Sequence, residues 1–285
     1  ASFSENMLLF LDLEAVGGNG PDSFFPNYAG MNGDAGSTQD GDAVDRLTIL
    51  EAWTEVKLIQ DKLTVTAGKI DLTNYFDINH AANDENTQFV SGAFINSAAL
   101  VVPSNAPGMS VRAEVIKNFY MQLGLSSLDN SGDYIFENIY KIVNFGLALC
   151  PAPGLEGNIR VYGYQYPLAD KAHGWGISID QNFQEHFRLF GRYGKNENDI
   201  SQIWGIKNAW SLGLNMKNHV FGKTMTTGVA FSENISCQAE SGNEKILELY
   251  FRYQLKAGVS ISPHLQQVWH RSEEHTSELQ SLLII

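Results

Sequence analysis

The chain has 285 residues, of which 44% are hydrophobic and 18% are charged, and this composition is too apolar for a disordered protein. Its formal net charge of −13 argues against a nucleic-acid-binding protein, which needs clustered Lys and Arg. No apolar run approaches the roughly 18 residues of a membrane-spanning helix, whereas a membrane-spanning β-strand needs only about 9–11 alternating residues. A soluble β protein and an outer-membrane β-barrel both remain open.

Alternation with a period of two recurs along the chain and predicts strands with one apolar and one polar face. In 174–180, for example, Trp175, Ile177 and Ile179 alternate with small or polar residues. Thirteen strands are expected, in chain order, at 5–14, 46–58, 63–72, 109–117, 119–127, 141–150, 158–166, 174–182, 187–195, 208–217, 224–232, 245–255 and 258–269.

The connections between these strands alternate between short and long, with 167–173 the one connection of modest length. Tight connections are expected at 59–62, 118, 151–157, 183–186, 218–223 and 256–257, and longer ones at 15–45, 73–108, 128–140, 196–207 and 233–244. A meander with turns at one rim and loops at the other gives this pattern, which is the plan of bacterial outer-membrane barrels. A Greek-key sandwich would mix the loop lengths. We therefore expect a single barrel domain.

The sequence predicts the local structure of two of the long connections. Residues 15–45 are rich in Gly, Asp and Asn, which predicts an irregular, exposed loop. In 82–100, Phe89, Phe94 and Ala98 have helical spacing, and Asn83 or Asp84 could cap a helix. We expect a short helix there, packed at or inside the mouth of the barrel.

Five arginines fall on the polar faces of the predicted strands, namely Arg112, Arg160, Arg188, Arg192 and Arg252. An arginine that faced lipid near the bilayer midplane would cost about 2–4 kcal/mol, so we expect the polar face to line a water-filled lumen. The alternative is the solvated outer face of a soluble sheet. That alternative leaves the alternation of loop lengths unexplained.

Carboxylates and aromatic rings share the polar face with the arginines: Glu51, Glu55, Glu114, Asp180, Glu248, Trp53, Tyr162, Tyr164 and Tyr250. Guanidinium and carboxylate groups together offer donors and acceptors, which suits the vicinal hydroxyls of sugars. A pore selective for anions should instead carry rings of one sign. The alternative is that these charges pair with one another and only stiffen the wall.

Motifs of covalent chemistry are missing from the sequence. No G-x-S-x-G, H-E-x-x-H or phosphate-loop pattern occurs, so we expect no enzyme, no catalytic residue, no metal and no cofactor. The histidines outside the carboxyl-terminal tail are scattered, mostly at turns, and are interpreted as surface residues: His80, His173, His186, His219, His264 and His270. Cys150 and Cys237 are expected at opposite rims, too far apart for a disulfide.

Several stretches resemble the OprB-type carbohydrate-selective porins of Gram-negative outer membranes. The clearest are EAWTEVKLIQDKLTVTAGKIDLTNYFD (51–77) and ANDENTQF (82–89), and ELYFRYQLKAGVSISPHLQ (248–266) is similar to a later family segment. The resemblance implies an all-β, antiparallel, up-and-down transmembrane β-barrel of the 16-stranded porin type, with about 13 strands present here and a short helix in a long loop.

The resemblance also implies passive, substrate-preferring diffusion of mono- or oligosaccharides through the outer membrane, in contact with lipid, with long loops extracellular and short turns periplasmic. The alternatives are a general, non-selective porin and a plugged structural or adhesive surface barrel. The residues expected to line the pore and contact the solute are Glu51, Trp53, Lys69, Asp71, Arg112, Glu114, Arg160, Tyr162, Asp180, Arg188, Arg192, Glu248 and Arg252.

Lys69 and Asp71 depart from the simple alternation. In 63–72 they share a parity with Leu63, Val65 and Ala67, which would turn them outward. Either a bulge at Gly68 resets the register, or both residues stand above the membrane. The resemblance favours their facing the mouth.

The end of the chain interrupts the strand pattern. Residues 271–281, RSEEHTSELQS, resemble the conceptual translation of a sequencing-library adapter. We therefore expect a porin domain over 1–270, incomplete at one or both ends, and a non-native tail over 271–285 that forms no regular strand. The barrel should then have a gap or an unpaired edge.

Overall fold

The fold was analysed in a computed structural model that describes residues 2–4, 6–25, 27–33, 35–36, 44–128, 131, 135, 137–168, 172–184, 186–237, 242–269 and 280–284. The strands are β1 (Ser2–Ser4), β2 (Met7–Val16), β3 (Arg46–Leu58), β4 (Leu63–Ile70), β5 (Ala106–Ile116), β6 (Phe119–Ser126), β7 (Tyr140–Leu149), β8 (Gly157–Gln165), β9 (His173–Phe183), β10 (Phe187–Asn196), β11 (Ile206–Val220), β12 (Lys223–Ser236), β13 (Asn243–Lys256), β14 (Val259–Ile261), β15 (His264–Trp269) and β16 (Gln280–Ile284). Short helices are η1 (Pro21–Ser23), η3 (Leu72–Asn74), α1 (Gly92–Ile95) and α2 (Asn198–Trp204).

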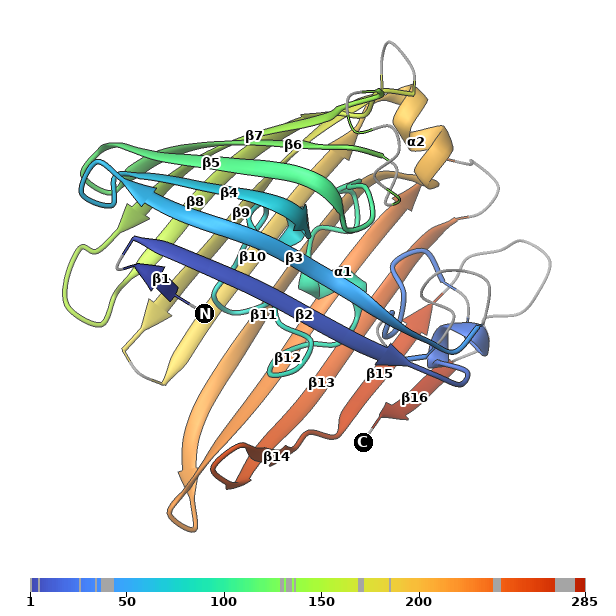
Figure 1. The fold of residues 1–285 in the computed structure, drawn as a ribbon. Helices are drawn as coiled ribbons and strands as arrows, with labels where there is room; N and C mark the ends of the chain where they lie inside the picture. Colours follow the sequence, from blue (N-terminus) through green and yellow to red (C-terminus); the bar gives the residue numbers. More distant parts are fainter. Residues whose placement is uncertain are drawn as a thin grey trace.

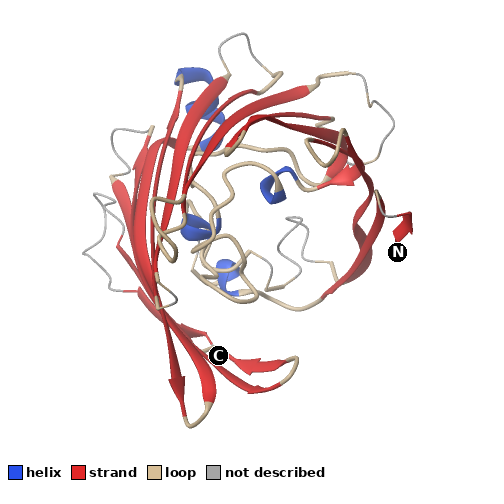
Figure 2. Ribbon diagram, turned by 90° about the vertical axis from the view of Figure 1, so that its left-hand side faces the viewer, coloured by secondary structure: helices blue, strands red, loops and turns tan. Residues whose placement is uncertain are grey.

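The strands form one antiparallel sheet in which consecutive strands pair, except that β14 and β15 both pair with β13 (Figure 1). Figure 2 shows this sheet curving around an interior that holds loops and short helices. All thirteen expected strands are present, so the prediction of an all-β, up-and-down sheet is confirmed. The last of them is split into β14 and β15, which share one register on β13, because Pro263 cannot donate to the ladder.

The end of the sheet differs in part from expectation. Residues 271–279 lie outside the described residues, but Gln280–Ile284 form β16, paired antiparallel with β15. The expectation of no strand in 271–285 is wrong for these residues, since an open strand edge is a template for any short apolar segment. Among the described strands β16 does not pair with β1 or β2, so the expected open edge is present.

The two faces of the sheet are the reverse of those in a soluble β protein. On β8, Arg160 is 2% exposed, whereas its neighbour Val161 is 43% exposed. The same contrast holds between Asp180 and Ile179 on β9, and between Glu248 and Leu247 on β13. The enclosed face is polar and the outer face is apolar, which is the arrangement that a bilayer requires.

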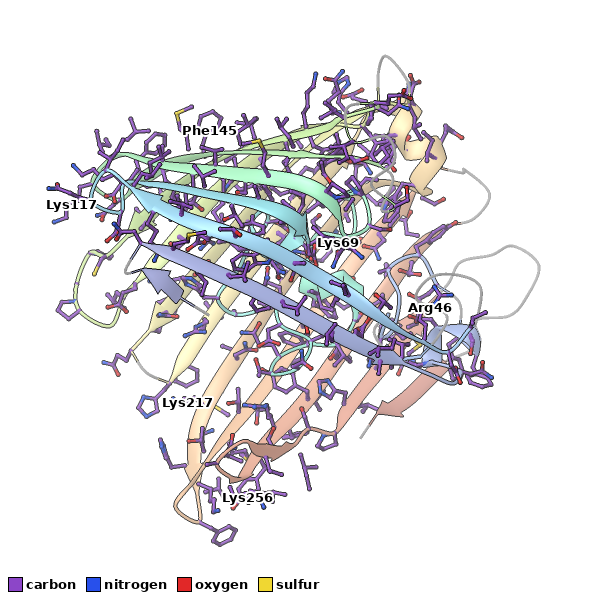
Figure 3. The ribbon with its side chains drawn as sticks, viewed as in Figure 1. Arg46, Lys69, Lys117, Phe145, Lys217 and Lys256 are labelled. Atoms are coloured by element: carbon purple, nitrogen blue, oxygen red, sulfur yellow. The ribbon has the colours of Figure 1, made fainter. Side chains whose placement is uncertain are left out.

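Aromatic side chains gather where several strands meet the long loops. Trp175 contacts Tyr193 with ring centroids 5.6 Å apart, and Trp210 contacts Phe231 at the same distance. Phe231 lies 6.5 Å from Trp269 at the end of β15. Amphipathic rings at this level are typical of the girdle that marks a membrane interface. Figure 3 shows Phe145 projecting from the same outer surface, further along the sheet.

The outer face gives a direct test of the membrane assignment. Replacing Val161, near the middle of β8, by Arg should destabilise the bilayer-inserted protein by about 2 kcal/mol or more, because the guanidinium would face lipid. Val259 is also outward but lies beside the turn after β13, so Val259→Arg should cost about 1 kcal/mol or less. Urea unfolding from liposomes measures both. Equal costs at the two positions would contradict the assignment.

On the enclosed face, aromatic rings lie over glycines of the neighbouring strand. Tyr120 lies opposite Gly146, and Tyr162 opposite Gly176. A Cβ atom at Gly146 would come within 2.2 Å of the Tyr120 ring, and one at Gly176 within 2.4 Å of the Tyr162 ring. The glycines therefore let large rings lie flat against the wall.

The two long connections at 15–45 and 73–108 agree with expectation only in part. The short helix expected in 82–100 is present as the four-residue α1, but Ser91 caps it rather than Asn83 or Asp84. In the first loop Met31 is 1% exposed and packs in one buried cluster with Phe89 and Phe94, so this loop is not simply exposed. None of the helices in the described part of the chain has the length and apolar character needed to cross a bilayer.

Candidate functional site

The interior is occupied by residues 71–105, which connect β4 to β5 and are called the inserted segment below. Arg192 on β10 is its main anchor, since its guanidinium donates to the carbonyl oxygens of Phe94 and Ala82 at 2.5 Å each, and to two further carbonyls. Its Nε lies 3.1 Å from the Oδ2 of Asp77, and both side chains are fully buried. One inward arginine thus binds both the earlier part of the segment, at Asp77 and Ala82, and its later part, at Phe94 and Ile95.

Glu248 on β13 is a second anchor for the inserted segment. Its carboxylate accepts hydrogen bonds from the backbone N–H groups of Val90 and Ser91 at 2.9 and 3.0 Å. His264 Nδ1 and Gln266 Nε2 from β15 contact the same carboxylate at 2.8 and 3.1 Å. Because Glu248 has no exposed surface, these partners replace its hydration.

The loop after β2 is also attached to the enclosed face. Glu244 accepts hydrogen bonds from the N–H groups of Tyr28 and Ala29, and Gln266 Nε2 donates to the Met31 carbonyl at 2.9 Å. Gly92 of the inserted segment donates to the carbonyl of Gly30. The two interior segments therefore dock on the same strands and on each other.

A polar network joins His80 of the inserted segment to Asn158 and Arg160 on β8 and Asp180 on β9. Arg160 Nη1 donates to Asp180 Oδ2 at 2.5 Å, and both side chains are nearly fully buried. Asn158 donates to the other oxygen of Asp180, and His80 Nδ1 lies 3.2 Å from it with 57% of the side chain exposed. Tyr162 is the next inward residue after Arg160 on β8 and is 2% exposed.

Glu51 holds the start of the inserted segment. Its carboxylate accepts from Asp71 N and Asn74 Nδ2, both at 3.0 Å, and from Trp53 Nε1 at 3.1 Å. Trp53 stacks on Phe10 with ring centroids 4.8 Å apart. Asp71 then caps η3 by accepting from Thr73 N.

Lys69 does not reach this cluster. The pairing of β4 with β3 and with β5 runs through Gly68 without a shift, so the bulge that could have reset the register is not there. Lys69 Nζ instead donates to the Ile49 carbonyl at 2.7 Å, in exposed surroundings near the end of β4 (Figure 3).

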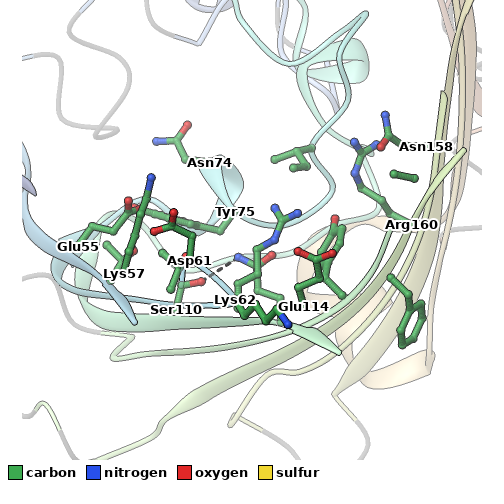
Figure 4. A pocket seen from close by; sticks show the side chains of 18 of the residues that line it. Glu55, Lys57, Asp61, Lys62, Asn74, Tyr75, Ser110, Glu114, Asn158 and Arg160 are labelled. Atoms are coloured by element: carbon green, nitrogen blue, oxygen red, sulfur yellow. Dashed lines mark hydrogen bonds between the residues drawn. The ribbon is translucent and has the colours of Figure 1, made fainter. Parts of the chain in front are cut away.

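A cavity of about 620 Å³, the first cavity, lies between the inserted segment and β3–β8. Figure 4 shows Glu55 and Lys57 from β3 beside Asp61 and Lys62 from the next turn, with Arg160 across the cavity. Carboxylates, cations and aromatic rings interleave on its wall: Glu55, Asp61, Glu114, Lys57, Lys62, Arg112, Arg160, Tyr75 and Tyr120.

Aromatic rings in the first cavity have neighbours that fix their orientation and protonation. The guanidinium carbon of Arg112 lies 3.7 Å from the centre of the Tyr120 ring, which keeps that ring flat against the wall. Burial, reinforced by the charge of Glu51, raises the pKa of Tyr75 well above its usual range. The Tyr75 hydroxyl therefore remains a neutral hydrogen-bond donor.

A second cavity of about 670 Å³ lies on the other side of the inserted segment, against β9–β13. Arg188 and Arg252 contribute to its wall, together with Lys217 and Tyr250. The thirteen residues expected at the pore thus separate into four groups: Arg112, Glu114 and Arg160 in the first cavity; Arg188 and Arg252 in the second; Tyr162, Asp180, Arg192 and Glu248 buried beneath the inserted segment; and Glu51, Trp53, Lys69 and Asp71 near its start.

Some residues of the site were not selected from the sequence. The inward positions of Tyr120 and Gln122 follow from the same period-two alternation that places Arg112 inward, so the sequence was sufficient to predict these two residues. Tyr75 and Asp61 lie in non-periodic segments, where no such signal exists. His264 was interpreted as a surface residue but is 3% exposed: it lies opposite Tyr250 on the adjoining strand, and its Nδ1 contacts the carboxylate of Glu248, two residues along that strand, at 2.8 Å.

Comparison with known proteins agrees with this geometry. Residues 10–134 match the model of the carbohydrate-selective porin, OprB family. Over these residues the chain is similar to the OprB family of porins. The resemblance that the strand motifs suggested is therefore confirmed.

Other similarities extend over more of the chain. An uncharacterized protein of Aquifex aeolicus (strain VF5) is 27% identical over 226 residues, which are 79% of this chain and 65% of that protein. The high-pH structure of Pseudomonas putida OprB superposes with a TM-score of 0.66 at 15% identity, covering 90% of this chain and 74% of that one. A mutant of the Rh. blastica porin gives a TM-score of 0.52 at 13% identity, covering 80% and 75%. These structural similarities establish a porin fold.

Proposed function

We propose that the protein is a porin of the bacterial outer membrane through which sugars diffuse passively, with no covalent chemistry. The OprB family match over residues 10–134 and the porin fold support a channel in that membrane rather than an enzyme. The apolar outer face and its aromatic band support contact with lipid. Residues 1–270 form one barrel domain in this proposal, with the long loops extracellular and the short turns periplasmic.

The proposed preference for sugars rests on the lining of the first cavity. Three carboxylates and four cations line it without a ring of one sign, and Tyr75 and Tyr120 supply aromatic rings. Vicinal hydroxyls can donate to the carboxylates and accept from the cations, while a ring face covers the apolar side of a sugar. Arg112, Glu114 and Tyr120 are the residues proposed to contact the solute.

The buried members of the expected pore lining have another role in this proposal. Arg192 and Glu248 are enclosed by the inserted segment, so they position the segment that narrows the lumen rather than touch the solute. Glu51 and Asp71 act in the same way at its start. The segment thus directs solutes toward the two cavities.

A plugged structural barrel is the second candidate, and the same anchors favour it. A segment held by a buried arginine, a buried glutamate and an aromatic cluster could close the lumen altogether. The two cavities beside the segment favour passage instead. Transport measurements separate these candidates from each other and from a general porin.

Liposome swelling tests the proposed function. We expect the reconstituted protein to admit glucose faster than a linear polyol of similar size. The double variant Arg112→Gln/Tyr120→Ala should reduce that preference by about two- to tenfold, because it removes one donor group and one ring face. Met121→Ala is the matched control, since Met121 is outward and 42% exposed.

Each alternative has its own signature in this assay. Equal rates for glucose and the polyol, unchanged in the double variant, would indicate a general porin. No swelling with either solute, from liposomes that contain folded protein, would indicate a plugged barrel. Either result would overturn the proposed function.

A further inference from the structure

The second cavity differs from the first in its charge. Of the described residues that line it, Arg188, Lys217 and Arg252 are cationic and Glu156 is the one carboxylate. Glu156 accepts a hydrogen bond from the N–H of Gly154 in its own turn. In a chain with a net charge of −13, this is a locally basic site.

The three cations have no carboxylate partner among the residues that the structure describes. Arg188 donates to two neutral oxygens, Asn182 Oδ1 at 2.7 Å and the His80 carbonyl at 2.5 Å. The Nε of Arg252 is buried and has no hydrogen-bond partner. In the described chain, the ion pairs of the enclosed face involve other groups, such as Arg160 with Asp180. Uncompensated charge of this kind is available to a ligand.

The strand register brings these groups to one place on the wall. Lys217 pairs with Thr226, and Thr226 pairs with Arg252, so the two cations lie in one inward row, separated by two strand spacings of about 4.8 Å each. Arg188 lies in the adjoining row, opposite Asn215. Lys and Arg side chains can converge from these positions on a single oxyanion.

Buried polar atoms with unused hydrogen-bonding capacity complete the wall. Tyr250 has no exposed surface, yet its hydroxyl has no hydrogen-bond partner. Asn215 is 8% exposed, and its Oδ1 has no partner either. Groups of this type are costly unless something binds to them. The phenol can donate to an oxyanion, and the amide oxygen can accept from a sugar hydroxyl.

We propose that the second cavity binds the oxyanion of an acidic monosaccharide, a hexuronate or a sugar phosphate. The charged group is held by Arg188, Lys217 and Arg252. The volume of the second cavity, about 670 Å³, accommodates one small solute with water. In the first cavity the carboxylates of Glu55, Asp61 and Glu114 offset the cations, so an acidic solute gains less there, and we expect acidic sugars to favour the second cavity. This inference rests on the proposed function and adds a second substrate class to it.

Calorimetric titration of the folded 285-residue chain in an uncharged detergent tests the proposal. The ligands are glucose, glucuronate and glucose 6-phosphate. We expect glucuronate to bind about tenfold more tightly than glucose, and that advantage to fall when NaCl rises from about 20 mM to about 300 mM. Binding of glucose 6-phosphate as well would show a general oxyanion site, and its failure to bind would restrict the site to carboxylates.

Variants then assign the effect to the cavity. Arg252→Gln and Arg188→Gln should each weaken glucuronate binding about tenfold and leave glucose binding unchanged. Arg252→Lys, which keeps the charge, should retain part of the affinity and shows that the site still folds. Lys256→Gln is the matched control, because it removes one cation from the same strand, outside the cavity.

Failure of this inference is distinguishable from failure of the proposed function. If glucose passes and binds but both anions bind no better than glucose, the second cavity has no anion site and the proposal is wrong. An anion advantage that survives Arg252→Gln and Arg188→Gln together would equally overturn it. Anion binding without any glucose transport would instead refute the proposed function alone.

Discussion

Replacing Arg192 by Leu is expected to release the inserted segment from the wall and to destabilise the folded protein by about 3–5 kcal/mol. Four backbone carbonyls would lose their donor, and Asp77 would be left as an unpaired buried carboxylate. Urea unfolding of the folded protein in detergent or liposomes measures the loss. Arg112→Leu, at an inward arginine that contacts the Tyr120 ring, should cost about 1 kcal/mol and is the control.

Proteolysis reports whether the segment itself is released. Phe89 and Phe94 have no exposed surface, so chymotrypsin should not cut the wild-type segment, whereas Arg192→Leu should be cut there at concentrations that leave the strands intact. The double variant Arg192→Leu/Asp77→Leu should recover part of the stability, because it leaves no lone charge. An uncut segment in Arg192→Leu would refute its role as an anchor.

The strands and the direction of their side chains follow from the sequence because both depend on local alternation. Arg160 and Val161 are neighbours in the chain, and period two alone places one inside and the other outside. The split of the last strand at Pro263 also has a local cause, the missing N–H. These features need no knowledge of distant contacts.

The docking of the inserted segment in the interior has no such local signal in the sequence. Arg192 recognises backbone carbonyls of residues about 100 positions earlier, and every residue type presents the same carbonyl group. The spacing of Phe89, Phe94 and Ala98 suggested a helix that includes all three, but only Phe94 lies in α1, and the Phe89 ring packs against Phe190 and Tyr250 of the wall. Tertiary packing therefore decided the conformation, and alternation could not tell a lining arginine from an anchoring one.

The same limit applies to the division into two cavities. The sequence indicates a mixed set of arginines, carboxylates and aromatic residues on one face, and the average of that set is nearly neutral. The inserted segment divides it, so that the first cavity holds cations and carboxylates in similar number, whereas Glu156 is the one described carboxylate in the wall of the second. This difference in charge between the cavities is a consequence of docking, which no strand pattern encodes.

Glu248→Leu should destabilise the protein by at least about 3 kcal/mol, because the buried N–H groups of Val90 and Ser91 would both lose their acceptor. His264 and Gln266 would lose the same partner on the adjoining strand. Glu248→Gln keeps one acceptor oxygen, so this variant should lose less unfolding free energy than Glu248→Leu. Urea unfolding ranks the two variants, and a cost below about 1 kcal/mol for Glu248→Leu would contradict the assigned contacts.

Glu248 and Arg192 hold the same segment from different strands, which makes their coupling measurable. Once either anchor is lost and the segment is released, the contacts of the other are lost as well, so the cost of the double variant should fall short of the sum of the single costs by about 1 kcal/mol or more. The pair Glu248→Leu and Arg112→Leu should be additive, because Arg112 holds no part of the segment's anchor contacts. Strict additivity of Glu248→Leu with Arg192→Leu would mean that the segment docks as independent pieces, and the interior would then open in stages.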